Sequence, residues 1–270
     1  MYLGVMTHLD DKIEETIANV KNMGFSSCQL CCWDYTLYTD EMAERVRNAC
    51  DKNGVKISTF WCGWSGGAAW NFYDGPHTLG IVPASHRFQR TRELLAGSDF
   101  AKKIGVENMA THAGFIPEVP TSTEYWGVIC ALREIAERCK QNGQYFMFET
   151  GQETPVTLRR AIEDIGTGNL GINLDPANLI LYGKANPVDA LDVFGEFVRD
   201  VHAKDGCYPT DGKNLGEEKP LGEGKVNFPA LIKKLKEVGY DGPLTIEREI
   251  SGPKQIEDIK AAKAMLEALI

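Results

Sequence analysis

The feature that most constrains the fold of this chain is a strict alternation of short apolar runs with longer amphipathic segments. The apolar runs are continuous rather than alternating, which is typical of parallel strands covered on both faces. We expect eight of them, over residues 2–7, 26–33, 55–64, 106–114, 144–150, 170–176, 198–205 and 242–249. Each precedes a segment with helical periodicity, over residues 10–24, 39–54, 86–104, 122–142, 155–165, 187–197, 228–238 and 256–270.

Eight strand–helix units in one uninterrupted chain predict an α/β fold, a closed (β/α)8 TIM barrel. The 270 residues suffice, because such a barrel typically needs about 250 residues. We expect a single domain over residues 1–270, since no linker-like stretch or change of composition divides the sequence. A doubly wound open sheet is the alternative, but it requires a glycine-rich phosphate turn after the first strand, and "GVMTHLDD" contains none.

Charge and composition argue against several classes of function. The net charge of −9 and the isoelectric point near 5.2 disfavour binding to a nucleic-acid backbone. The sequence contains no run of about 18 apolar residues, so we expect no transmembrane helix. The start of the chain, "MYLGVMTHLDD", lacks the sections of a signal peptide, so we expect a cytoplasmic protein without a membrane partner. The eight cysteines are not spaced as zinc ligands, so we expect reduced, buried side chains.

Four of the expected strands deliver an ionisable side chain at their carboxyl end, where TIM barrels place their chemistry. These side chains are Glu149, Asp175, His202 and Glu247, on strands five to eight. Adjacent strands lie about 5 Å apart, so the four side chains converge on one point. Three carboxylates this close repel one another unless a cation lies between them. The set predicts one divalent metal ion, with Mn²⁺ favoured and Co²⁺, Mg²⁺ or Zn²⁺ as alternatives.

Each of these residues, taken alone, has an ordinary structural alternative. A carboxylate that follows a strand often caps the next helix, and Asp175 is placed to cap "PANLILY". A single histidine is more often structural than a ligand. The metal hypothesis therefore depends on the occurrence of all four residues in consecutive strand–helix units.

The motifs around these residues resemble those of the xylose-isomerase-like superfamily of barrels, the sugar phosphate isomerases and epimerases. "FETGQET", "NLDPAN", "VHAKDG" and "IERE" are similar to the metal-binding motifs of the ketose 3-epimerases. The resemblance implies that Glu149 and Glu247 bind the metal and also act as acid and base on opposite sides of a sugar substrate. It implies an isomerase or epimerase that proceeds through an enediolate, and it implies a homodimer.

Two positions depart from the epimerase pattern. Asn178 stands where many relatives have a substrate-binding histidine, and Lys204 and Asp205 follow His202 where the epimerases have an arginine. Asn178 and the acidic chain also make an AP-endonuclease-like nuclease a weaker match. A lyase or hydrolase acting on a keto-sugar, such as a keto-inositol or a 3-keto-glycoside, is therefore the alternative to an epimerase. A non-catalytic sugar-binding barrel is the third hypothesis.

Further residues are candidates for binding the small-molecule substrate. His112 and His8 end strands four and one, and Trp33 and Trp61 end strands two and three, where aromatic faces suit sugar rings. Lys204 and Asn178 are candidates from strands seven and six. Glu153 is placed either to orient a metal ligand through a hydrogen bond or to lie in the first turn of the following helix. The loop "GWSGGAAWNFYDGP" is a candidate lid. His86, Arg87 and Arg90 bind an anionic substrate group or, as we favour, are surface charges.

Overall fold

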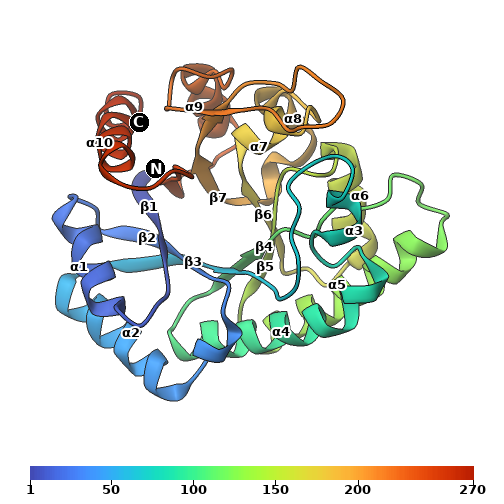
Figure 1. Cartoon of the computed structure of the whole chain (residues 1–270), viewed down its shortest axis with the longest axis horizontal. Helices are drawn as coiled ribbons and strands as arrows, with labels where there is room; N and C mark the ends of the chain where they lie inside the picture. Colours follow the sequence, from blue (N-terminus) through green and yellow to red (C-terminus); the bar gives the residue numbers. More distant parts are fainter.

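The computed structural model describes residues 1–270 and forms a closed barrel of parallel strands surrounded by helices (Figure 1). The barrel order is β1-β2-β3-β4-β5-β6-β7-β10, with β10 paired to β1. Its strands are β1 (Tyr2–His8), β2 (Ser27–Cys32), β3 (Lys56–Cys62), β4 (Asn108–Thr111), β5 (Tyr145–Glu149), β6 (Leu170–Leu174), β7 (Val198–Ala203) and β10 (Pro243–Ile246). The predicted (β/α)8 TIM barrel is confirmed.

The major helices follow the expected segments. They are α1 (Ile13–Asn22), α2 (Asp40–Asn53), α4 (Ala84–Lys103), α5 (Thr123–Gln141), α6 (Pro155–Ile165), α8 (Pro187–Phe194), α9 (Phe228–Glu237) and α10 (Pro253–Glu267). The side chain of Thr39 accepts a hydrogen bond from the Met42 amide and caps α2, as the sequence indicates. Gly54 ends the same helix with a φ of 62°, in the left-handed region that favours glycine. None of the helices has the length and apolar character that a bilayer span requires.

Several short elements were not expected from the sequence. They are α3 (Gly75–Thr78), the 3-10 turn Tyr35–Leu37, and a hairpin of β8 (Asp205–Gly206) with β9 (Glu218–Lys219). These elements are too short to show a periodic pattern. The short helix α7 (Pro176–Leu181) begins one residue after β6, in the segment where the sequence offers Asp175 as a cap. The 3-10 turn Gly195–Phe197 directly follows α8, inside the expected helical segment.

Inside the barrel, a polar network lies beside a small apolar cluster of four buried residues, whereas the layer between strands and helices is the main apolar core. Asp200 on β7 is fully buried and accepts hydrogen bonds from the hydroxyl groups of Ser58, Thr59 and Thr245, at 2.9, 2.8 and 3.0 Å. All eight cysteines are free. Cys28, Cys31, Cys32, Cys62 and Cys139 are buried, as expected, while Cys130 is exposed.

Arg90 holds the loop after β3 in place. The interpretation of Arg90 as a surface charge is wrong, because its side chain is fully buried. Its guanidinium group donates to the carbonyl oxygens of Ser65 and Gly80 at 3.0 and 2.7 Å. It also lies over the Trp64 ring, 4.0 Å from the ring centroid. These contacts hold the loop against the start of α4, and the same loop carries Trp70 to the wall of the central cavity.

Candidate metal centre

The structure brings together the four side chains at the carboxyl ends of β5, β6, β7 and β10. Glu149 is the last residue of β5, Asp175 and Glu247 directly follow β6 and β10, and His202 lies within β7. One ligand atom from each residue lies within 4.8 Å of the others. Three of the residues are buried, and the side chain of Glu247 is 13% exposed. This group is suited to holding one metal ion.

The imidazole of His202 lies among the three carboxylates. Its Nδ1 atom is 2.9 Å from Glu247 Oε2, 3.4 Å from Glu149 Oε1 and 3.7 Å from Asp175 Oδ2. Asp175 Oδ2, His202 Nδ1 and Glu247 Oε2 are buried and make no hydrogen bond of good geometry, although Lys204 Nζ lies 3.4 Å from each of the two oxygens. Buried polar atoms are costly without partners, and a divalent cation at their common centre would satisfy all three at once. The chemistry and the placement of these donors therefore fit a divalent metal ion.

The other nitrogen of His202 is engaged by side chains inside the barrel. His202 Nε2 lies 2.9 Å from the side-chain oxygen of Gln29, on β2, and 3.0 Å from Asn173 Nδ2, on β6. Gln29 in turn donates from Nε2 to Asn173 Oδ1 at 2.9 Å. When Nε2 carries a proton it donates to Gln29, and Nδ1 is left as the nitrogen with a free lone pair. Neither Gln29 nor Asn173 was among the residues predicted from the sequence.

The geometry of Asp175 is compatible with both of the roles that the sequence left open. Its Oδ1 atom accepts a hydrogen bond of 2.9 Å from the Asn178 amide and caps α7. Its Oδ2 atom faces the cluster of ionisable groups and has no hydrogen-bond partner. The capping role therefore does not compete with ligation, because the two oxygens of one carboxylate are divided between the two tasks.

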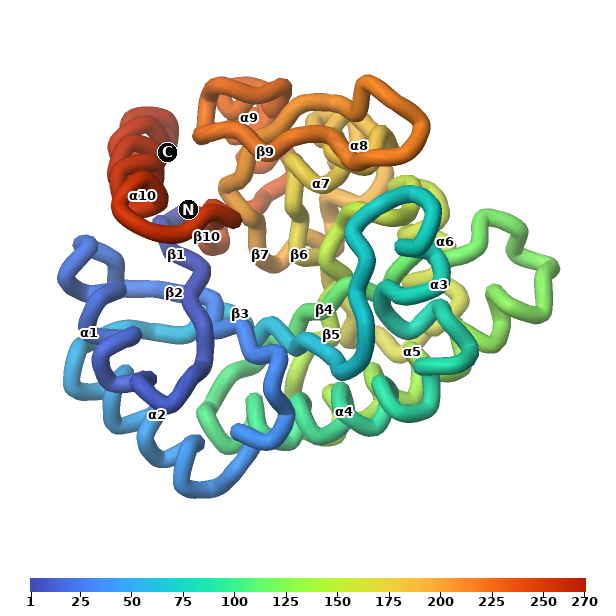
Figure 2. Tube along the Cα trace, in the orientation of Figure 1, coloured from blue at the N-terminus to red at the C-terminus, as the bar shows by residue number.

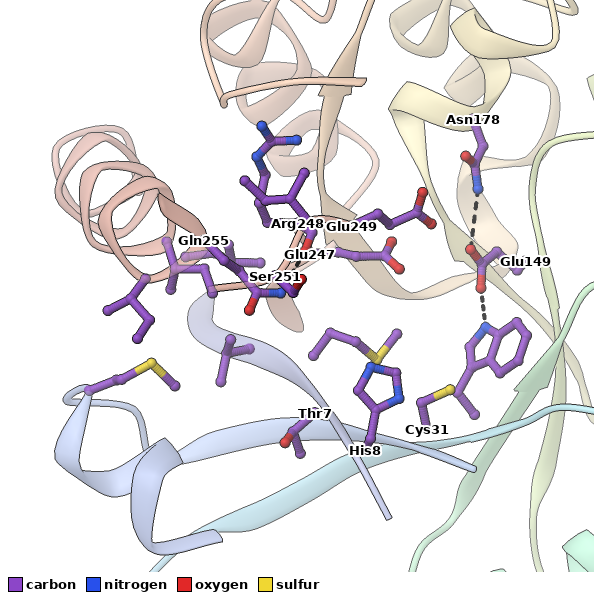
Figure 3. A pocket seen from close by; sticks show the side chains of 18 of the residues that line it. Thr7, His8, Cys31, Glu149, Asn178, Glu247, Arg248, Glu249, Ser251 and Gln255 are labelled. Carbon is purple, nitrogen blue, oxygen red and sulfur yellow. Dashed lines mark hydrogen bonds between the residues drawn. The ribbon is translucent and has the colours of Figure 1, made fainter. Parts of the chain in front are cut away.

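Glu149 is surrounded by donors. The Trp61 indole donates from Nε1 to Glu149 Oε2, and Asn178 donates from Nδ2 to Oε1 at 3.3 Å (Figure 3). His112 Nε2 lies 3.4 Å from the same Oε1. Burial acts to raise the pKa of Glu149, but the charges of His112 and His202 outweigh it and hold the pKa well below its ordinary value. Glu149 is therefore ionised at neutral pH.

Lys204 contacts the carboxylates of the centre rather than the open cavity. Its Nζ atom is 2.8 Å from Glu249 Oε1 and 3.4 Å from both Asp175 Oδ2 and Glu247 Oε2. Although burial acts to lower the pKa of Lys204, Glu247 and Glu249 raise it well above its ordinary value. Lys204 therefore places a permanent positive charge beside two of the candidate ligands.

Asp205, the next residue, organises a loop. Its carboxylate accepts hydrogen bonds of 2.9 and 3.0 Å from the amides of Gly222 and Gly224. The Val226 amide also donates to it, at 3.0 Å. Gly224 is required here, because a Cβ atom at this position would lie 2.0 Å from Asp205 Oδ1. The segment "LGEGK", residues 221–225, therefore has a structural role, which is to wrap around the carboxylate of Asp205.

A cavity of about 1060 Å³ opens in front of the centre. His112, Asn178, Glu149 and Glu247 line it together with His8, Trp33, Trp61 and Trp70. His8 and Trp33 are exposed at its edge, whereas Trp61 and His112 are buried. Glu153 is also buried, but it is not among the residues that line the cavity. The aromatic and polar side chains suit a small, hydroxylated molecule.

Residues 17–269 match the family model described as a xylose isomerase-like TIM barrel. The chain belongs to this family. A solved xylose isomerase-like protein, the xylose isomerase domain protein from Planctomyces limnophilus, is 34% identical, with a TM-score of 0.94 over 100% of this chain and 98% of that chain.

Two more distant relatives of this xylose isomerase-like barrel are also informative. An uncharacterized protein from Methanocaldococcus jannaschii is 31% identical over 179 residues, which are 62% of this chain and 57% of that protein. The 3-keto-D-glucoside 4-epimerase from E. coli shares the fold at 17% identity, with a TM-score of 0.74 over 99% of both chains. At this identity the likeness is evidence of the fold alone.

Proposed function

We propose that the chain is a divalent-metal-dependent sugar isomerase or epimerase that removes a proton next to a carbonyl group. The observation that carries the proposal is the convergence of one donor atom each from Glu149, Asp175, His202 and Glu247 within 4.8 Å. Family membership supports an enzyme that acts on a small-molecule sugar or keto-sugar. We propose these four residues as the metal ligands, with Mn²⁺ as the favoured ion and Co²⁺, Mg²⁺ or Zn²⁺ as alternatives.

A thiolate is not among the proposed donors. Cys31 lines the same cavity, but it does not belong to the group of ligand atoms that converge within 4.8 Å. The converging donors are three carboxylates and one imidazole. When bound, the divalent cation supplies an electrophile for the carbonyl and the adjacent hydroxyl oxygen of the sugar.

Glu149 and Glu247 are the proposed acid and base. They extend from β5 and β10, and their carboxylates point toward each other across the cavity (Figure 3). A sugar carbon between them has a carboxylate on each face. One glutamate removes the proton beside the carbonyl, which gives an enediolate, and the other returns a proton on the opposite face or at the neighbouring carbon. Removal and return on opposite faces inverts one stereocentre.

The side chains around the cavity are the proposed substrate-binding groups. The Trp61 and Trp33 rings, with centroids 5.1 Å apart, present apolar faces to the sugar. His112 offers its Nδ1 atom, which is buried and has no hydrogen-bond partner. Asn178 orients Glu149, and Lys204 acts through the carboxylates that it contacts.

A lyase or hydrolase acting on a keto-sugar is the second candidate function. The same proton abstraction begins both reactions, and they differ in the fate of the enediolate. Expulsion of a leaving group requires an acid of its own, and His112, which lines the cavity, is the candidate for that role.

Solvent deuterium exchange tests the proposed function. The chain is dialysed against chelator, supplied with Mn²⁺, and incubated in D₂O with a panel of ketoses, inososes and 3-keto-glycosides. Deuterium incorporation that yields only an epimer or isomer supports the first function, whereas release of water or an aglycone supports the second. Exchange that is equally fast in the chelated protein contradicts the role of the metal in both.

A further inference from the structure

Lys204 is a buried cation beside the candidate metal centre. It directly follows β7, which lies between β6 and β10 in the barrel (Figure 2). It comes two residues after His202 and therefore shares the inward face of that strand. Its side chain is only 1% exposed. A lysine is almost never buried this deeply unless it is paired, so the atoms around its ammonium group indicate what it does there.

Four oxygen atoms surround the ammonium group of Lys204. Glu249 Oε1 lies 2.8 Å from Nζ, and Asp175 Oδ2, Glu247 Oε2 and Asn178 Oδ1 each lie 3.4 Å from it. Only the contact with Glu249 has the length of a strong charge-assisted hydrogen bond. The other three contacts are those of a cation placed among oxygen atoms. Carboxylate and amide oxygens are also the ligands that Mg²⁺ and Mn²⁺ prefer in proteins.

Two of these four oxygen atoms belong to the candidate metal centre as well. Asp175 Oδ2 and Glu247 Oε2 lie 3.7 and 2.9 Å from His202 Nδ1, and both lie 3.4 Å from Lys204 Nζ. Carboxylates that are shared in this way bridge the two ions of two-metal sites, which lie about 3.5–4 Å apart. The ammonium group of Lys204 therefore lies where the second ion of such a pair would bind.

The position of the ammonium group is accessible from the central cavity. Glu247, Glu249 and Asn178 all line this cavity. The carboxylates of Glu247 and Glu249 lie next to each other and point toward Asn178 and Glu149 (Figure 3). A divalent ion holds its oxygen ligands closer than an ammonium group does, at about 2.0–2.1 Å for Mg²⁺. The side chain of Glu249 is 58% exposed, so it has the freedom to move toward an ion.

We propose that Lys204 is a built-in cation that occupies a second divalent-metal position, so that the centre of this chain holds one metal ion rather than two. Its positive charge compensates the carboxylate of Glu249 and restrains the two shared carboxylates, but it offers no coordination position to a substrate. This inference rests on the proposed function, because it takes Glu149, Asp175, His202 and Glu247 to hold the first ion. It adds the residue that sets the number of ions.

The number of Mn²⁺ ions bound by variants of the full chain tests the inference. Calorimetric titration and metal analysis after gel filtration give this number. We expect one ion for the wild type and two for Lys204→Ala, because alanine vacates the position and leaves its four oxygen atoms. Lys204→Ala/Glu249→Ala lacks the nearest of these oxygens and should bind one ion again. A single ion in Lys204→Ala, with circular dichroism like that of the wild type, overturns the inference.

Two further variants complete the comparison. Lys233→Ala removes a lysine of α9 whose side chain is 80% exposed, and it should bind one ion like the wild type. Lys204→Gln keeps most of the side-chain volume and is neutral, so it serves if the alanine variant does not fold. It should also bind a second ion, because its amide oxygen is itself a ligand for Mn²⁺. A folded Lys204→Gln with one ion overturns the inference.

Electron paramagnetic resonance locates the second ion in Lys204→Ala. Two Mn²⁺ ions that share oxygen atoms of Asp175 and Glu247 are coupled magnetically. The second equivalent of Mn²⁺ should therefore produce the spectrum of a coupled pair instead of doubling the signal of the first ion. Two ions without coupling place the second one elsewhere on the chain, which overturns the inference.

The failure of the inference differs from the failure of the proposed function. One ion in both the wild type and Lys204→Ala keeps the proposed metal-dependent reaction and removes the role of Lys204. A wild type that binds no Mn²⁺ contradicts the proposed function. If Lys204→Ala then binds an ion that the added Glu249→Ala removes, the exchange of Lys204 for a metal ion still holds. Two coupled ions in the wild type overturn the inference, because Lys204 then excludes nothing.

Discussion

The Nε2 atom of His202 lies 2.9 Å from the side-chain oxygen of Gln29, a residue on a strand that is not adjacent to its own in the barrel. This contact fixes which imidazole nitrogen faces the three carboxylates. We expect Gln29→Met to weaken Mn²⁺ binding about 10–100-fold, as is typical when a partner of a metal-bound histidine is lost. Calorimetric titration measures the affinity, with the exposed Gln141→Met as control. Unchanged affinity would show that His202 needs no such partner.

The proposed acid and base give a second prediction. Glu149→Gln and Glu247→Gln should each reduce deuterium exchange by about 10²–10⁴-fold, because each removes a proton-transfer group. The far-ultraviolet circular dichroism should stay unchanged, since both side chains lie at the mouth of the barrel. Glu257→Gln, on the exposed surface of α10, is the matched control. Full activity in either mutant excludes that residue as acid or base.

The protonation of His202 makes metal binding depend on pH. Without a metal, burial acts to lower the pKa of His202, but the charges of Glu247 and Glu149 raise it well above the ordinary value. A metal ion must displace this proton, so affinity for Mn²⁺ should fall as the pH falls, by up to about tenfold per pH unit below that pKa. Titrations in buffers of different ionisation enthalpy measure the released proton. Binding without proton release contradicts the assignment of His202 as a ligand.

Glu153 should make the free energy of unfolding depend on pH. Burial raises its pKa to about 8, from an ordinary value of 4.5. The folded state therefore disfavours ionisation of Glu153. The free energy of unfolding falls as the pH rises from 4.5 to about 8, because the unfolded chain ionises this carboxyl group at the lower pH. Glu153→Gln lacks this ionisation and should raise the melting temperature at pH values above the raised pKa, with little change near pH 4. The difference is on the order of a few kcal/mol. Thermal melts across this range test it, and a constant difference at all pH values would refute it.

Arg90 should contribute to stability through the loop after β3. Arg90→Ala leaves the carbonyl groups of that loop without their donor and should destabilise the fold by about 3 kcal/mol. Urea unfolding measures the loss. Arg92→Ala, at an exposed position two residues further along α4, should have almost no effect. Equal effects of the two substitutions would mean that the buried contacts of Arg90 add nothing to stability.

The barrel and the placement of the four candidate ligands were predictable from the sequence, because strand–helix alternation and strand ends are local patterns. The polar network inside the barrel was not predicted, since its contacts join strands that are far apart in the chain. Asn173 and Asp200 each lie two residues before a predicted ligand and so share its inward face. That spacing is the signal that could have indicated them. Gln29, a lone amide in "SSCQLCCW", is a second such signal.

For a similar reason, the sequence gives an incomplete interpretation of Trp61 and a wrong one of Arg90. Trp61 is predicted to offer its ring to the substrate, but its indole N–H also donates to Glu149, a contact that depends on how β3 and β5 lie on either side of β4. Arg90 follows a long loop whose path the sequence does not indicate. Arg90 is buried only because that loop folds back over α4. The charge of an arginine, taken by itself, predicts a position on the surface.

The divided carboxylate of Asp175 restricts which substitutions this position accepts. A glutamate here is longer, so its carboxylate could not both cap α7 and place an oxygen at the candidate metal centre. An asparagine would keep the capping oxygen but would lack the negative charge. If the proposed function is correct, a substitution at this position can impair folding through the lost cap and turnover through the lost ligand. A variant that loses only one of the two properties would separate these effects experimentally.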